Sequence, residues 1–242
     1  MNGGEALVAA LLAHDVKMSF CVPGESYLTV LEALRQARGR IRLVLNRHES
    51  GAALAAEAYA KATGKPGIVF VTRGPGATNA SIGLHTAKQD STPLVLFIGH
   101  VPTEEMGREA FQEIDYPTAF GPLTKRVIEV MRPEDITSAT AEALKESVAG
   151  RPGPVAVVLP EDVTESEVQI AAPEPRTALH PDARKVAEAA QLIDSACHPV
   201  IIGGEQINFE DAHGALARFA DAAGAGVVSA FRRQDILAHD HN

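Results

Sequence analysis

Glu49 is the residue with the clearest chemical potential, because it heads the alanine-rich segment ESGAALAAEAYAKATG. A run of small residues that ends before Gly64 predicts a helix over Glu49–Ala62. An acid in a first helical turn is ordinary, because the helix dipole favours negative charge there. The glycine and alanines behind Glu49 allow close packing on several faces, so we expect the helix head to be buried. A buried carboxylate that can pass a proton near neutral pH suits general acid–base catalysis.

A glycine-containing segment, TRGPGATNA (Thr72–Ala80), forms a second candidate site. It is predicted to be a loop between the strand Ile68–Thr72 and a helix over Ala77–Lys88. No Gly-Lys-Ser/Thr follows and the dinucleotide spacing is absent, so it is neither kind of nucleotide fingerprint. Two interpretations stay open: an anion held at a helix N-terminus, or a tight turn packed against a neighbour.

Histidines give little further chemistry. His48, His85 and His100 are interpreted as polar residues at the ends of elements. Neither a G-x-S-x-G elbow nor an H-E-x-x-H zinc motif occurs, so we assign no serine nucleophile and no metal ligand.

These candidates lie between apolar runs that alternate with helical patterns. Such runs, rich in Val, Ile and Leu and bounded by Gly or Pro, are typical of buried parallel strands. The alternation predicts a doubly wound α/β fold, a mostly parallel sheet with helices on both faces. The other expected strands are Ser19–Val22, Ile41–Leu45, Leu94–Ile98, Arg126–Val130 and Val155–Leu159, and the other helices Gly4–Ala13, Tyr27–Arg38 and Glu134–Ala149.

The interval from His100 to Thr124 breaks this rhythm, and a long irregular loop in a compact domain is usually functional or mobile. We predict a first domain over residues 1–168, a proline-containing linker over 169–183 and an incomplete second α/β domain over 184–242. Because two strands and two helices make a poor core, we expect the chain to be the front part of a longer protein.

Composition excludes several classes of function. The chain has 242 residues and a net charge of −9, which argues against a nucleic-acid or anionic-membrane partner. It has no apolar stretch long enough to span a bilayer and no signal peptide. The two cysteines, Cys21 and Cys197, suggest free thiols in a reducing compartment, and we expect a cytoplasmic protein.

Together the motifs CVPGES, NRHESGAALAAEAYAKATGKPGIVFVTRGPGATNA, DSTPLVLFIG, EAFQEIDY and GRPGPVAVVLPEDV resemble one family in order and spacing. They are similar to the N-terminal, pyrimidine-binding domain of thiamine-diphosphate enzymes of the acetolactate synthase group. Residues 184–242 resemble the start of that family's central domain. The resemblance implies that Glu49 binds N1′ of the cofactor's aminopyrimidine and promotes the imino tautomer, which removes the thiazolium C2 proton.

The resemblance also implies roles for other positions. Pro23, Gly24, Thr72, Pro75, Gly76 and Asn79 match positions that surround the cofactor, while Glu25, Phe111, Gln112 and Lys125 match positions near the substrate. Many acetolactate synthases have a small residue where Glu25 stands, and this difference leaves the substrate open. Arg73 replaces the serine that is commonest there, and the resemblance implies no role for it.

The implied activity is decarboxylation and carboligation of a small 2-oxo acid, with the cofactor as electron sink. A benzoylformate- or oxalyl-type decarboxylase, a sulfoacetaldehyde-type acetyltransferase and a non-catalytic scaffold are the alternatives. The resemblance implies thiamine diphosphate as cofactor, with magnesium held by a C-terminal domain that this sequence lacks, and it leaves FAD open. It also implies a homodimer or homotetramer, and we expect the 242 residues alone to be inactive.

Overall fold

A computed structural model describes residues 1–169 and 181–239 of the chain. The chain divides into two compact units, Met1–Pro173 and Glu174–Asn242, and each is described by itself. Most of the linker predicted for residues 169–183 lies outside the described residues. None of the described helices is both long and apolar enough to cross a membrane.

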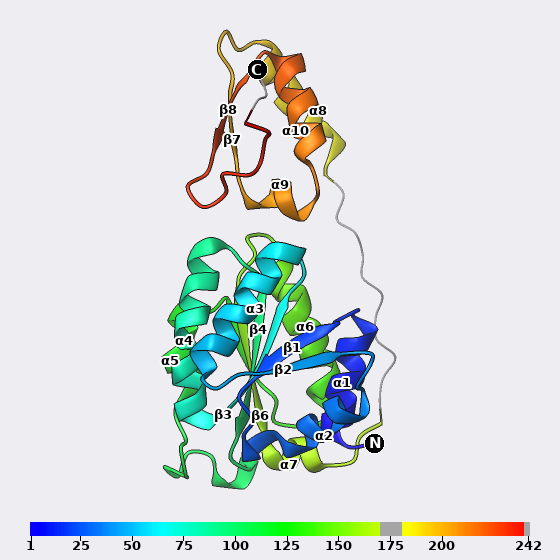
Figure 1. The fold of residues 1–242 in the computed structure, drawn as a ribbon, viewed down its shortest axis with the longest axis vertical. Coiled ribbons are helices and arrows are strands. Elements are labelled where there is room, and N and C mark those ends of the chain that lie inside the picture. Colours follow the sequence, from blue (N-terminus) through cyan, green and yellow to red (C-terminus); the bar gives the residue numbers. More distant parts are fainter. Residues whose placement is uncertain (170–180, 240–242) are drawn as a thin grey trace. The chain divides into compact units, whose positions relative to one another are not determined.

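The N-terminal unit is built on a six-stranded sheet in the order β2-β1-β3-β4-β6-β5 (Figure 1). Every neighbouring pair is parallel, which confirms the predicted fold class. The central strands β3, β4 and β6 are almost wholly buried, as their continuous apolar sequences require. The strands are β1 (Met18–Cys21), β2 (Arg42–Leu45), β3 (Gly67–Thr72), β4 (Leu94–His100), β5 (Arg126–Glu129) and β6 (Pro154–Pro160).

Helices cover both faces of this sheet (Figure 1). On one face, α1 (Gly3–Ala13), α2 (Leu28–Gln36) and α6 (Ile136–Val148) pack over a core that includes the stacked rings of Phe70 and Phe97. On the other, α3 (Glu49–Thr63) and α4 (Arg73–Asp90) pack over Val69, Val71 and Leu96. Alternate residues of a strand point to opposite faces, so each central strand serves both cores.

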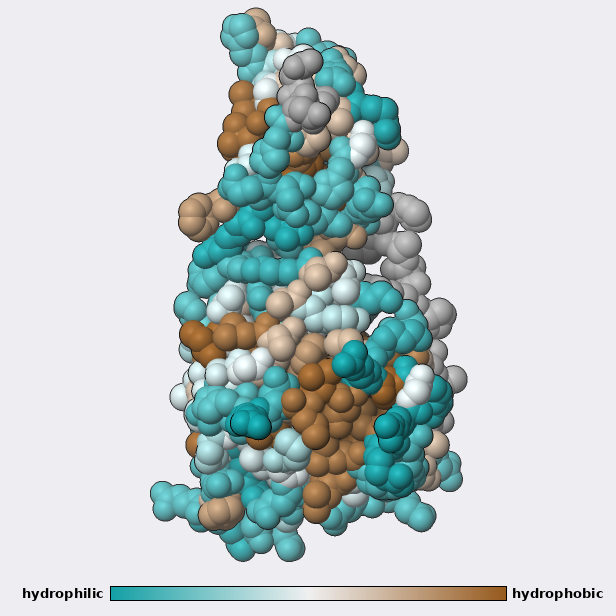
Figure 2. Space-filling model, viewed as in Figure 1, coloured by the Kyte–Doolittle hydropathy of each residue, from teal (hydrophilic) through white to brown (hydrophobic). Residues whose placement is uncertain are grey.

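The edge strand β2 is only partly covered. Leu45 at its end and Leu28 at the start of α2 are exposed, and Figure 2 shows hydrophobic surface gathered over these two elements.

The interval after His100 contains only short elements. They are the 3-10 turns η2 (Thr103–Glu105) and η3 (Gly121–Leu123) and the helix α5 (Tyr116–Phe120), so the predicted irregular segment is largely confirmed.

The predicted loop at the start of α4 is wrong. The helix begins at Arg73 rather than Ala77, so Gly74, Pro75 and Gly76 lie in its first turn. Proline is tolerated there because the first N–H groups of a helix have no partner within the helix. The glycines therefore allow neighbouring segments to approach the helix closely, and they do not form a turn.

The second unit holds the parallel strands β7 (Val200–Gly203) and β8 (Gly226–Ser229). It also holds the helix α10 (His213–Ala223) and the short helix α9 (Glu205–Phe209), which fits the α/β character predicted for this part of the chain. The helix α8 (Ala183–Asp194) buries none of its residues, and Ile202 on β7 is 78% exposed. This unit thus buries little apolar surface within itself.

Candidate active site

The candidate residues gather at the carboxyl ends of β1 and β3. From β1 the chain passes to β2 on one side, and from β2 it returns to β3 on the other side of β1. Such a switch in winding direction opens a crevice between the two strand ends, where ligands of open α/β sheets bind. Pro23, Gly24 and Glu25 follow β1, and Thr72 and Arg73 follow β3.

The two strand ends are in very close contact. A Cβ atom added to Gly24 would lie 2.4 Å from the Cβ atom of Thr72, so only glycine allows this approach. Beside it, the hydroxyls of Ser26 and Thr72 share a hydrogen bond of 2.7 Å. This bond occupies the Thr72 hydroxyl, which lies at the N-cap of α4 and makes no capping bond to the helix. These contacts hold the segments that follow β1 and β3 close together.

Glu49 enters the crevice from the head of α3. His48 precedes it as the N-cap, and its Nδ1 accepts a hydrogen bond of 3.2 Å from the Ser50 backbone N–H. One carboxylate oxygen of Glu49, Oε2, accepts a hydrogen bond of 3.0 Å from the Asn79 amide. The other oxygen, Oε1, lies 3.5 Å from where a Cβ atom on Gly76 would stand. Asn79 therefore orients the carboxylate, and Gly76 leaves space beside its second oxygen.

Glu49 is half-buried, so the expectation of a buried helix head is wrong for the single chain. One face of α3 packs inward through Ala52, Ala53 and Ala56. The opposite face, with Gly51 and Leu54, is exposed. An alanine-rich helix can pack on all sides, but a single chain covers only one of them.

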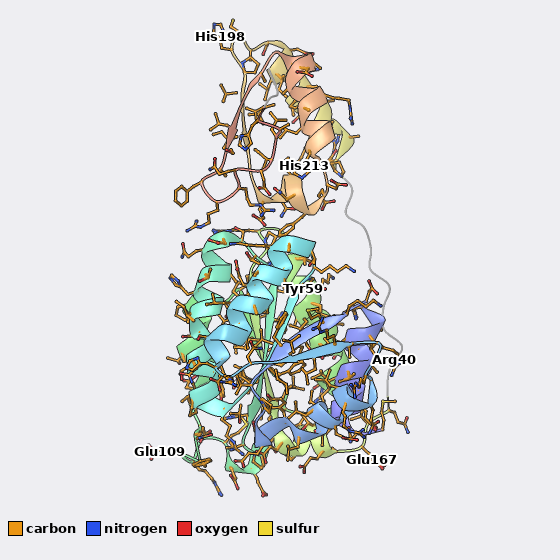
Figure 3. All side chains as sticks on the ribbon, viewed as in Figure 1. Arg40, Tyr59, Glu109, Glu167, His198 and His213 are labelled. Atoms are coloured by element: carbon orange, nitrogen blue, oxygen red, sulfur yellow. The ribbon has the colours of Figure 1, made fainter. Side chains whose placement is uncertain are left out.

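The irregular loop after β4 is fastened to the start of α4. The Gln112 carbonyl accepts a hydrogen bond of 2.9 Å from the Gly74 N–H, and a Cβ atom on Gly74 would lie 2.7 Å from that carbonyl oxygen. The Glu113 carboxylate accepts hydrogen bonds from the backbone N–H groups of Gly107 and Ala110, which lower its pKa. Phe111 remains 68% exposed. Glu109 lies at the tip of this loop, at the opposite end of the sheet from Tyr59 on α3 (Figure 3).

Arg73 joins these segments, although the sequence assigned it no role. Its Nη1 donates a hydrogen bond of 2.7 Å to Glu25, and its Nη2 donates to Glu161, the first residue of α7 (Glu161–Glu165) after β6. Its guanidinium carbon lies 5.6 Å from the centre of the Phe111 ring. Burial alone lowers the pKa of Arg73, but hydrogen bonds to the two glutamates more than offset that effect and raise it.

Two further buried residues lie near Arg73. His100 ends β4, and its ring meets the Tyr116 ring edge-on with 4.8 Å between the centroids. Burial lowers the pKa of His100, Glu113 opposes this shift, and the positive charge of Arg73 adds to it. Burial raises the pKa of Tyr116. A histidine within an apolar strand gives a weak signal for a site, and sequence reasoning had interpreted His100 only as a strand end.

Lys125 is the one predicted site residue that the structure places elsewhere among the described residues. It precedes β5, at the amino edge of the sheet, whereas the crevice lies at the carboxyl edge. Its ammonium group donates hydrogen bonds to the Glu146 and Ala149 carbonyls at the end of α6. A cation suits this position because the helix dipole is negative there. The other predicted site residues all lie on the segments that meet at the crevice.

Two family models match the chain: the N-terminal thiamine pyrophosphate binding domain over residues 1–119, and the central domain of the same enzymes over residues 186–242. The chain therefore belongs to the thiamine pyrophosphate enzymes. Along its whole length it is 36% identical to a probable acetolactate synthase large subunit of Methanocaldococcus jannaschii and 37% identical to the acetolactate synthase large subunit of Corynebacterium glutamicum. It spans 42% and 39% of those two relatives.

A solved structure shares the fold. The thiamine diphosphate-dependent 4-hydroxybenzoylformate decarboxylase of Rhodococcus jostii superposes with a TM-score of 0.85 over 95% of this chain and 44% of that chain. The sequence identity is 24%. The likeness supports the architecture of both units and leaves the reaction to be argued from the site.

The crevice fits the pyrimidine end of thiamine diphosphate. Asn79 holds one oxygen of the Glu49 carboxylate, Gly76 places no side chain beside the other oxygen, and Gly24 places none at the strand ends. The diphosphate end needs a bound cation with several oxygen ligands. Within residues 1–169 and 181–239 no group of three or more His, Cys, Asp or Glu side chains could hold a metal ion. The described residues thus fit one end of the cofactor.

Proposed function

We propose that the protein is a thiamine-diphosphate-dependent enzyme that decarboxylates a small 2-oxo acid and joins the product to a second carbonyl compound, as acetolactate synthases do. The observation that carries this proposal is the Glu49 carboxylate at the switch-point crevice, oriented by Asn79 with space beside its free oxygen. The identity to acetolactate synthase subunits over the whole chain supports it.

When bound, the cofactor supplies the electron sink that decarboxylation of a 2-oxo acid requires. Glu49 would hold a proton at the pyrimidine nitrogen of the bound cofactor, while the hydrogen bond from Asn79 to its Oε2 atom fixes the plane of the carboxylate. The first turn of α4 supplies a wall of small residues. A side chain at Gly76 would be crowded there, since a Cβ atom would lie only 3.3 Å from Thr72 Cγ2.

The loop with Phe111 and Gln112 serves the substrate. The Gln112 backbone is fastened to Gly74 with a positive φ of 62°, so the direction of the side chain is set by a conformation that few residues adopt. A side-chain amide in this position can donate to a substrate carbonyl or carboxylate. The exposed Phe111 ring can cover that contact from water.

We also propose that the protein forms a homodimer through the outer face of α3 and α4. The two helices pack tightly through Ala53 and Gly83, and their outer surface exposes Leu54 and Ile82, the latter by 49%. A partner would bury the side of α3 beside Glu49. Ile82→Glu should lower the oligomeric mass measured by light scattering, with Met131→Glu, at a 47% exposed position of the same unit, as a matched control.

The decisive experiment follows exchange of the cofactor C2 proton in the full-length protein with thiamine diphosphate and magnesium. Glu49→Gln keeps the shape and the bond to Asn79 but removes the proton relay, so exchange should slow by about 10²- to 10⁴-fold. Glu57→Gln, on the same helix but paired with Lys61, is the matched control and should leave exchange unchanged. An unchanged exchange rate in Glu49→Gln would exclude the proposed role.

Product analysis with pyruvate then separates acetolactate synthesis from the other reactions of the family. The departure at Glu25 favours a second candidate, a related decarboxylase or acyltransferase with a different substrate. Acetolactate as product supports the first candidate. Decarboxylation without carboligation supports the second, and neither product, from protein with bound cofactor, indicates a scaffold.

A further inference from the structure

The ion pair between Glu25 and Arg73 spans the switch point itself. Glu25 comes from the loop after β1, and Arg73 is the first residue after β3, so their bond of 2.7 Å bridges the two strand ends that form the crevice. Phe111, beside the predicted substrate residue Gln112, lies over the same guanidinium. A positive charge is therefore built into the wall of the crevice on the side of the substrate loop.

The two carboxylates that hold Arg73 differ in their surroundings. The Arg73 side chain is only 8% exposed, and that of Glu161 is 26% exposed, whereas the Glu25 side chain is 68% exposed. Glu161 is the inner partner, and Glu25 closes the site from the solvent side. Because water competes for the exposed Glu25 carboxylate, its ion pair with Arg73 is weaker than a pair of two buried charges.

The guanidinium also keeps unused hydrogen-bonding capacity. Its Nε atom is buried and has no hydrogen-bond partner among the described residues, nor do His100 Nδ1 and Tyr116 Oη nearby. Buried polar atoms normally have partners, so three unpaired atoms at one place indicate a site built for another polar group. All three belong to residues at or beside the carboxyl edge of the sheet.

We propose that Arg73 is a specificity-determining residue that binds a second carboxylate of the substrate, and that Glu25 occupies this anion subsite in the free protein. The inference rests on the proposed function, since it names the substrate class of that same crevice: a 2-oxo acid, or its carbonyl acceptor, that carries a further carboxylate. When the substrate is a small monocarboxylic acid, Glu25 stays paired with Arg73.

A carboxylate fits this subsite better than other anions. The group that already occupies it is the planar carboxylate of Glu25, and a guanidinium pairs with such a group through parallel N–H donors. A substrate carboxylate that replaces Glu25 meets the guanidinium beside the Phe111 ring, whose centre lies 5.6 Å from the guanidinium carbon. The exchange replaces one carboxylate partner of Arg73 with another, and no covalent step is involved.

The kinetic test uses the full-length protein with thiamine diphosphate and magnesium. We expect a higher kcat/KM for 2-oxoglutarate or oxaloacetate than for 2-oxobutyrate or pyruvate. Arg73→Lys, which retains the charge beside Glu161, should lower the preference for the dicarboxylic acids by about 10- to 100-fold, because a paired, hydrogen-bonded charge contributes that much. Glu25→Gln should increase it. Arg126→Gln, which removes an exposed ion pair with Glu142 at the edge strand, is the control.

Binding of unreactive analogues gives a measurement that does not need turnover. Calorimetry should show tighter binding of glutarate than of butyrate, with the difference reduced in Arg73→Lys and enlarged in Glu25→Gln. If Arg73→Lys fails to fold, Glu25→Gln decides alone, because an unchanged glutarate affinity in that variant overturns the proposal. An equal loss of activity on mono- and dicarboxylic acids in both variants also overturns it, since Glu25 would then serve every substrate.

The two proposals fail in different ways. Turnover of pyruvate without any preference for dicarboxylic acids, and without Arg73-dependent glutarate binding, refutes the subsite and leaves the proposed function standing. Arg73-dependent binding of glutarate without decarboxylation of any 2-oxo acid supports the subsite and refutes the proposed function.

Discussion

Gly83 and Gly51 provide a sensitive test of the contact between α3 and α4, because the same substitution should act in opposite directions at the two positions. A Cβ atom on Gly83 would lie 2.4 Å from the Cβ atom of Ala53 and 2.9 Å from its carbonyl carbon. A Cβ atom on Gly51 would meet only the Asn46 side chain, at 3.9 Å. Both glycines lie within helices, so the gain in helix propensity applies to both.

The expected magnitude follows from these distances. Extra volume at a packed contact costs about 1–3 kcal/mol, and the upper part of that range applies at Gly83 because backbone and Cβ atoms cannot turn aside. Alanine gains at most about 1 kcal/mol over glycine inside a helix. Gly83→Ala should therefore destabilise the N-terminal unit by about 1–2 kcal/mol, whereas Gly51→Ala should leave it unchanged or stabilise it by up to about 1 kcal/mol.

Urea unfolding followed by tyrosine fluorescence measures the N-terminal unit alone. The chain has no tryptophan, and its three tyrosines, Tyr27, Tyr59 and Tyr116, all lie in that unit. Equal midpoints for Gly83→Ala and the natural sequence would refute the described contact. Equal destabilisation by both variants would show that the glycines matter for another reason, such as contact with a partner subunit.

Three further predictions concern the residues around the crevice and the opposite edge. Gln112→Ala should change the apparent substrate affinity or the product ratio and leave C2 proton exchange near normal; loss of cofactor binding with normal substrate kinetics would contradict its role. Lys125→Met should cost about 1–2 kcal/mol in urea unfolding, through lost bonds at the α6 terminus, without changing KM. The lowered pKa of His100 means that, below pH 6.5, the unfolded chain binds a proton that the folded chain does not. As the pH is lowered below 6.5, the free energy of unfolding should therefore decrease by at most about 1.4 kcal/mol per pH unit, and His100→Gln should reduce this slope.

The sheet was predictable because its central strands have continuous apolar sequences between Gly and Pro. The runs at β3, β4 and β6 match the observed strands to within two residues, and burial of both faces explains why they show no alternation. The start of α4 was not predictable in the same way. Two glycines and a proline are typical of a loop, and only the contacts of Gly74 and Gly76 explain why a helix uses them.

The sequence predicted that Glu49 begins a helix, but it did not predict how far its side chain is exposed. Its place at a helix head follows from the sequence, because the apolar run, the histidine cap and the alanine pattern are all local. Its burial depends on what covers Gly51 and Leu54, and the sequence of one chain does not contain that information. Lys125 shows the converse, since a resemblance placed it near the substrate whereas its hydrogen bonds place it at the far edge of the sheet.

The ion pairs of Arg73 were not predicted from the sequence, although the order of the strands contains enough information to predict them. Glu25 lies 48 residues before Arg73 in the sequence, and Glu161 lies 88 residues after it, so no local sequence pattern connects them. Yet each follows a strand of the parallel sheet directly or within a few residues: β1, β3 and β6. Parallel strands bring all their carboxyl ends to one edge, and charged residues at those ends are forced into one neighbourhood whatever their separation along the chain. An arginine after one strand and glutamates after two others therefore predict a charge cluster at the crevice, and the unexplained Arg73 and the departure at Glu25 are two halves of a single feature.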